Sequence, residues 1–108
     1  MIAAVNTRFS AAALGCLLAV CTSSVWAHYP YMDCAREGDG IRCEIGFSDG
    51  TFAVGSDVVV YDYDERELAR ATADEHSQVY FDWPDGEFFI QFDAGHEDPA
   101  EYDYVELK

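Results

Sequence analysis

The sequence predicts a small all-β domain, an antiparallel β-sandwich of about seven strands that follows a cleaved signal peptide. The first 27 of its 108 residues differ in composition from the rest. After them, β-branched and aromatic residues recur in short alternating runs, a pattern typical of strands. Turn residues separate these runs at even spacing, and no stretch has helical periodicity. Residues 28–108 are long enough for one domain only, so we divide the chain into 1–27 and 28–108.

Residues 1–27 have the three parts of an export signal. A single charged residue, Arg8, precedes the apolar run 11–20, and the polar residues 22–24 follow it. That order is typical of a secretory signal peptide. The apolar run is shorter than the roughly 20 residues that a transmembrane helix needs, and we expect no such helix in the mature chain.

The predicted cleavage site lies after Ala27. Val25 and Ala27 occupy the positions that signal peptidase recognises, so the mature chain is expected to begin at His28. An alternative is lipid attachment at Cys21, which is less favoured because Val20 stands where a small residue is expected. We therefore expect a periplasmic or secreted protein.

Strands are expected to begin near residues 29, 41, 57, 67, 77, 87 and 101. In the first strand, Tyr29 and Tyr31 are expected to pack into the core. The second alternates apolar and polar residues over 41–47, which is typical of a half-buried strand. The third is apolar on both faces over 58–61, which predicts a central strand.

The remaining strands follow the same logic. The fourth starts at residue 67 and ends in a turn near residue 75. Large apolar side chains then alternate over 79–83 and again over 88–92, each set defining one buried face. The seventh strand is expected to include Tyr102 and to run to Leu107.

The charge of the mature chain is strongly negative. All 21 acidic residues follow residue 27, against five of the six basic residues. Nucleic acids and anionic membranes are therefore excluded as expected partners, whereas cations and basic partners are attracted. The acidic turn 62–67 lacks the order of ligands in an EF-hand loop, and we expect it to be a solvated hairpin end.

No enzyme motif is present. The sequence lacks a Gly-x-Ser-x-Gly elbow, a His-Glu-x-x-His helix and a phosphate-binding glycine loop. A sandwich of this size also offers little room to desolvate a pair of carboxylates. We therefore predict a protein that is not an enzyme.

Two phrases resemble a known family. Residues 55–62 (Gly-Ser-Asp-Val-Val-Val-Tyr-Asp) and 84–95 (Pro-Asp-Gly-Glu-Phe-Phe-Ile-Gln-Phe-Asp-Ala-Gly) are similar to carboxypeptidase regulatory-like, or prealbumin-like, domains. The resemblance covers roughly 41–107 and implies an immunoglobulin-like sandwich. With His28 and the phrase Asp-Ala-Gly-His at 93–96, the chain further resembles periplasmic accessory components of nickel and cobalt uptake systems.

His28 is the first candidate metal ligand. After cleavage it carries an α-amine and an imidazole, which can chelate one divalent transition metal such as Ni, Co or Cu. Pro30 has no amide N–H, so a chelate cannot continue along the backbone and another residue must complete the site. His96 is the best candidate and His76 the next. The leading hypothesis is a non-catalytic binding module accessory to metal handling.

The alternative hypothesis is a structural or protein-interaction domain of the cell envelope that binds no metal. In that case the edge of the sandwich or the segment Tyr29–Tyr31 would contact an envelope protein partner.

Cys34 and Cys43 are expected to form a disulfide. They flank a turn with Gly38 and Gly40, in paired strands where opposed residues lie within disulfide reach. Closing this loop would stabilise the domain by roughly 2–3 kcal/mol in the chain-entropy model. The alternative makes both cysteines thiolate ligands beside His28, but their spacing is wider than the short Cys pairs of zinc sites.

Overall fold

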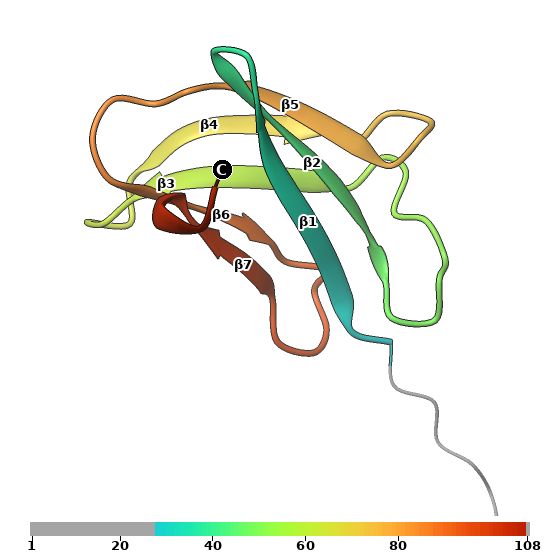
Figure 1. Ribbon diagram of the computed structural model, residues 1–108. Helices are drawn as coiled ribbons and strands as arrows, with labels where there is room; N and C mark the ends of the chain where they lie inside the picture. The colour runs from blue at the N-terminus through green and yellow to red at the C-terminus, as the bar shows by residue number, and fades with distance from the viewer. Residues whose placement is uncertain (1–27, 108) are drawn as a thin grey trace, which may run out of the picture.

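Seven strands form two antiparallel sheets that pack face to face in the computed structural model, which describes residues 28–107 (Figure 1). The elements are β1 (Pro30–Glu37), β2 (Gly40–Phe47), β3 (Asp57–Asp62), β4 (Glu67–Thr72), β5 (Gln78–Asp82), β6 (Phe88–Phe92), β7 (Ala100–Asp103) and the 3-10 helix η1 (Tyr104–Glu106). One sheet has the order β1-β2-β5 and the other β4-β3-β6-β7. The predicted fold class is confirmed, and each strand begins within one residue of its expected start.

The predicted signal peptide, residues 1–27, lies outside the described residues, as does the alternative lipid attachment at Cys21. Within residues 28–107 there is no helix with the length and apolarity needed to cross a membrane.

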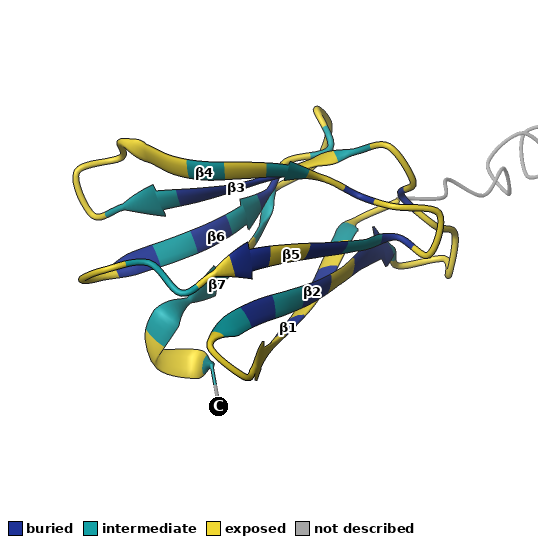
Figure 2. Ribbon diagram, turned by 90° about the horizontal axis from the view of Figure 1, so that it is seen from above, coloured by how far each residue is buried: buried dark blue, intermediate teal, exposed yellow. Residues whose placement is uncertain are grey.

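The core lies between the two sheets (Figure 2). Strand β6 buries Phe88, Ile90 and Phe92 completely, because alternate residues of a strand share one face. Strand β3 is paired on both sides and buries three consecutive residues, Val58–Val60. The prediction of a central strand is therefore confirmed.

A disulfide joins the first two strands. Cys34 lies directly opposite Cys43 in the β1–β2 register, their Cα atoms are 4.1 Å apart, and the two sulfurs are bonded. Both side chains point into the core. The bond thus joins two strands of one sheet, and the predicted pairing is confirmed. Such a bond is consistent with an oxidising compartment outside the cytoplasm.

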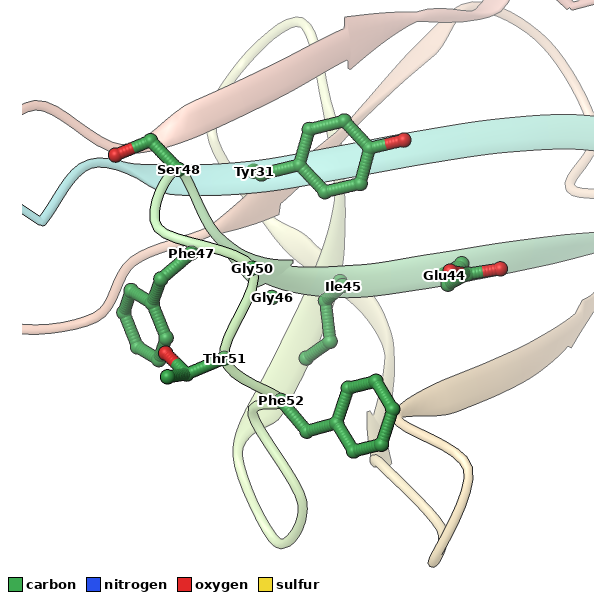
Figure 3. A pocket seen from close by; sticks show the side chains of 9 residues that line it. All are labelled: Tyr31, Glu44, Ile45, Gly46, Phe47, Ser48, Gly50, Thr51 and Phe52. Atoms are coloured by element: carbon green, nitrogen blue, oxygen red, sulfur yellow. The ribbon is translucent and has the colours of Figure 1, made fainter.

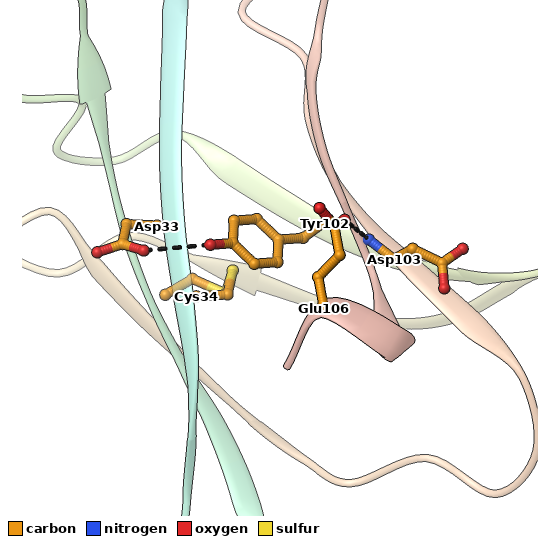
Figure 4. The surroundings of a disulfide bond; sticks show 6 residues. Asp33, Cys34, Tyr102, Asp103 and Glu106 are labelled. Carbon is orange, nitrogen blue, oxygen red and sulfur yellow. Dashed lines mark hydrogen bonds between the residues drawn. A yellow bond between two sulfur atoms is a disulfide. The ribbon is translucent and has the colours of Figure 1, made fainter. Parts of the chain in front are cut away.

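The end of the chain differs from the prediction. The expected seventh strand to Leu107 is wrong, since β7 ends at Asp103 and η1 follows. The Asp103 carboxylate accepts from the Val105 N–H, while Glu106 accepts from the Asp103 N–H at 2.8 Å. This reciprocal capping box satisfies amides of a helical turn. Next to it, the Tyr102 hydroxyl donates to Asp33 of β1 at 3.3 Å, which links the edges of the two sheets (Figure 4).

The acidic turn between β3 and β4 is an exposed hairpin end, as predicted. Asp62 accepts hydrogen bonds from the backbone N–H groups of Asp64 and Arg66, and its other oxygen lies 3.1 Å from the Arg66 guanidinium. The bond from the Arg66 amide is the main reason that the pKa of Asp62 is lowered. The carboxylate of Asp62, the last residue of β3, therefore organises the hairpin turn.

Candidate functional site

His28 is held against the connection between β2 and β3. Its Nδ1 atom lies 2.7 Å from Oδ2 of Asp49. The neighbouring Tyr29 N–H donates to the Ser48 hydroxyl, and the Ser48 N–H donates to the Tyr29 carbonyl. These bonds continue the β1–β2 pairing beyond the strand ends, so they position the imidazole beside the carboxylate.

Asp49 is a fixed and charged partner. Its Oδ1 atom accepts from the backbone N–H of Thr51 at 3.0 Å and from the Thr51 hydroxyl at 2.7 Å. The backbone bond, followed by the hydroxyl bond, lowers the pKa of the Asp49 carboxyl, and the charge of His28 adds to the effect. Because Thr51 takes up Oδ1, the other oxygen, Oδ2, faces the imidazole.

His96 lies at the same end of the sandwich as His28. Its ring stacks on Phe47, with centroids 6.0 Å apart and planes at 17°. Phe47 ends β2 and immediately precedes Ser48, which bonds to Tyr29. The sequence left open whether the N-terminal segment and the loop after the sixth strand share an end of the sandwich; they do (Figure 1).

The three histidines do not form one cluster. His76 lies in the β4–β5 turn, where its exposed side chain is 3.5 Å from Glu75. Among residues 28–107, no three His, Cys, Asp or Glu side chains are grouped as they would be around a metal. Cys34 and Cys43 are bonded to each other, so neither offers a thiolate. The structure thus pairs His28 with Asp49, a partner that the sequence did not suggest.

A second feature, the aromatic slot, lies on the outer face of the three-stranded sheet. Tyr31, Gly46 and Phe52 stand in one row, because Gly46 pairs with Tyr31 on β1 and forms an isolated bridge with Phe52. They line a pocket of about 300 Å³, whose rim includes Glu44 (Figure 3).

The slot corrects one expectation. Tyr29 and Tyr31 were expected to pack into the core, but their exposed fractions are 52% and 48%. Met32 and Cys34 take the inward positions of β1, so the alternation of the strand turns Tyr31 outward. Phe52 is 70% exposed and belongs to no alternating run of the sequence. The one local signal for the slot was Gly46, a residue without a side chain at an outward position of a strand.

Comparisons with protein-family models, with curated proteins and with solved structures find no match. Residues 28–107 form a small all-β domain of two antiparallel sheets with three and four strands, arranged like a sandwich.

Proposed function

We propose that this protein is a non-catalytic binding module outside the cytoplasm that captures one divalent transition metal ion, Ni, Co or Cu, as an accessory to metal handling. The observation that carries the proposal is the contact between His28 Nδ1 and Asp49 Oδ2. The resemblance of residues 55–62 and 84–95 to carboxypeptidase regulatory-like, or prealbumin-like, domains supports the same assignment, as does the likeness to accessory components of nickel and cobalt uptake.

The ligand set consists of two nitrogens and one oxygen. Cleavage after Ala27 frees the α-amine of His28, which chelates together with Nδ1, and Asp49 adds a carboxylate oxygen. Two neighbouring ligands at about 2.0–2.2 Å lie about 3 Å apart around a square-planar or octahedral ion and about 3.4 Å apart around a tetrahedral one. The observed separation of 2.7 Å between Nδ1 and Oδ2 is that of a charge-assisted hydrogen bond, so the two atoms have to move apart by a few tenths of an ångström or more to hold one ion. Imidazole nitrogen suits Cu and Ni, and the pairing with Thr51 keeps the carboxylate in place.

The other two histidines differ in their position relative to this pair. His96 stacks on Phe47 at the same end of the sandwich, and it is the candidate for a further ligand. His76 lies in another turn beside Glu75, so it serves as the matched control. The acidic surface around all three raises the local concentration of cations.

Calorimetric titration of the chain beginning at His28 with Cu²⁺, Ni²⁺, Co²⁺ and Zn²⁺ tests the proposal. We expect one-to-one binding tighter than about 1 μM, which is lost when residues are added before His28. Asp49→Asn and His96→Ala should each weaken binding about tenfold or more, in line with losses at metal sites, while His76→Ala leaves it unchanged.

The contrary result is weak binding at several sites that ignores both the N-terminal extension and Asp49→Asn. It would mean that an acidic surface merely attracts cations. The second candidate function, a protein-interaction domain of the cell envelope, would then take its place. The exposed aromatic slot of Tyr31 and Phe52 favours that function.

A further inference from the structure

The aromatic slot lies between Tyr31 and Phe52, at the position where Gly46 has no side chain. Neighbouring strands are about 4.8 Å apart, so the backbones at Tyr31 and Phe52, on either side of Gly46, are separated by about 10 Å. Gly46 puts no side chain between the two rings. A Cβ atom there would lie 2.8 Å from the Thr51 carbonyl oxygen. The slot therefore has two aromatic walls and a floor that includes a carbonyl oxygen.

A carboxylate stands beside the slot. Glu44 lies two residues before Gly46 on β2, which places it on the same outer face. It is exposed and makes no hydrogen bond or ion pair with the described residues. Aromatic faces attract cations, and a carboxylate attracts them further. The slot is thus complementary to a positive charge on an apolar stem.

The arginines of residues 28–107 do not fill this role, because each has a partner elsewhere. The Arg36 guanidinium lies 4.5 Å from the centroid of the Trp83 ring, and Arg42 makes an ion-pair contact of 3.3 Å with Glu37. Arg66 and Arg70 are paired with carboxylates at the two ends of the β3–β4 hairpin. No arginine among residues 28–107 is therefore placed to fill the slot.

We propose that the aromatic slot binds a lysine or arginine side chain of a basic, extended segment of a partner protein. The alkyl stem of that side chain packs between Tyr31 and Phe52, and its charge meets Glu44. A small free cation would leave most of its surface in water, since the slot is open along the sheet. A chain segment lying across the sheet also contacts the exposed ring of Tyr80. The slot shares the loop residues Ser48, Gly50 and Thr51 with the surroundings of the His28–Asp49 pair, but neither His28 nor Asp49 lines it. The inference does not depend on metal binding.

The test is an NMR titration of the chain beginning at His28, in the presence of a chelator. The probes are a capped octapeptide of alternating Lys and Thr, its Gln–Thr counterpart, and tetramethylammonium. We expect the Lys–Thr peptide to shift the resonances of Tyr31, Gly46 and Phe52 in a saturable way. Phe52→Ala and Glu44→Gln should each weaken binding about fivefold. Leu68→Ala and Glu101→Gln, exposed positions on the other sheet, should change it less than about twofold.

Four outcomes would overturn the proposal. The first is that the Lys–Thr peptide fails to bind. The second is that the shifted resonances are spread over both sheets and that Phe52→Ala and Glu44→Gln leave the affinity for the peptide unchanged. The Gln–Thr peptide binds equally well, which removes the role of the cation. Tetramethylammonium binds as tightly as the Lys–Thr peptide, which removes the role of the partner chain.

Discussion

The outer faces of the two sheets use the same kinds of side chain in different ways. On the four-stranded sheet, Arg70 lies 3.1 Å from Asp57 and 2.7 Å from Glu67, and the Thr72 hydroxyl donates to Asp57. The bond from Thr72, followed by that from Arg70, lowers the pKa of Asp57. This face has a hollow of about 350 Å³ as well, and its lining includes the ion-paired side chains of Asp57 and Arg70.

On the three-stranded sheet, Arg42 pairs with Glu37 and the Tyr80 hydroxyl donates to Gln78, but the side chains of Tyr31 and Glu44 beside the aromatic slot have no such partner among the described residues. Glu44 makes no ion pair, and the rings of Tyr31 and Phe52 stand apart with only Gly46 between them. A ligand in the hollow beside Asp57 has to compete with the Arg70 ion pair, whereas a ligand between Tyr31 and Phe52 displaces no ion pair among the described residues. Both faces carry acidic and aromatic side chains, so composition does not distinguish them. Side chains that lack a partner within the protein identify a binding face better.

The two sheets also differ in how they are held together. Strand β3 is the doubly paired centre of the four-stranded sheet and buries Val58–Val60. The smaller sheet has fewer strands, and its edge strand β1 is bonded to β2 through the disulfide. Small domains bury modest cores and often depend on such a covalent link.

The largest expected effect comes from removing that link. Cys34→Ala combined with Cys43→Ala should lower the free energy of unfolding by about 2–3 kcal/mol, because the unfolded chain is no longer constrained. For a domain of this size the Tm should fall by about 10–20 °C. Calorimetry with and without reductant measures the change. A reductant that lowers the Tm of the wild type but not that of the double variant is the control.

Two results would contradict this account. An unchanged Tm would show that the disulfide contributes nothing to the smaller sheet. Loss of metal affinity in a variant of normal stability would support the alternative that Cys34 and Cys43 bind metal as thiolates, although the two sulfurs are bonded to each other in the structure.

A smaller effect is expected at the floor of the slot. Gly46→Ala places a Cβ atom 2.8 Å from the Thr51 carbonyl oxygen. This oxygen accepts a hydrogen bond from the Phe47 N–H, so it cannot move away freely. We expect a loss of about 1–3 kcal/mol in the free energy of unfolding, typical of overpacking. Chemical denaturation measures it.

The matched control lies at the other end of the same strand. Gly40→Ala meets the Phe81 carbonyl oxygen at 2.6 Å and should destabilise similarly. Only Gly46→Ala should also weaken binding of the Lys–Thr peptide. Equal peptide binding by both variants would mean that Gly46 is not part of the peptide-binding site.

The sequence predicted the strands and the disulfide because both depend on local patterns. Alternation located β2 and β6, and a short glycine turn implied that Cys34 and Cys43 face each other. The last turn was missed because side-chain capping by Asp103 and Glu106 outweighed strand-forming residues. The His28–Asp49 pair and the row Tyr31, Gly46 and Phe52 were missed since they join segments whose pairing no local pattern encodes.

The smallest effect concerns the four-stranded side, where a phenol is tied to a carboxylate. The Tyr63 hydroxyl donates to Asp103 at 2.8 Å, and this bond is the main reason that the pKa of Tyr63 is raised to about 12. A raised folded-state pKa stabilises the fold below the unfolded value of about 10. That contribution is lost as the pH rises through about 12. Tyrosinate absorbance during an alkaline titration should therefore show a late step.

Two variants assign this late step. Tyr63→Phe should reduce the late step by one tyrosine, leaving Tyr102, whose pKa is also raised, chiefly by burial. Asp103→Asn should move the Tyr63 part of the step towards the ordinary pKa of tyrosine, because the amide carries no charge to repel a phenolate. An alkaline titration that neither variant changes would mean that the pair between Tyr63 and Asp103 does not persist in solution. The four-stranded sheet would then have unsatisfied groups of its own, and the contrast with the aromatic slot would weaken. If the step moves as expected, the Asp103 carboxylate is paired with a tyrosine in solution. The Glu44 carboxylate beside the aromatic slot has no such donor among the described residues, and this difference distinguishes the two sheets.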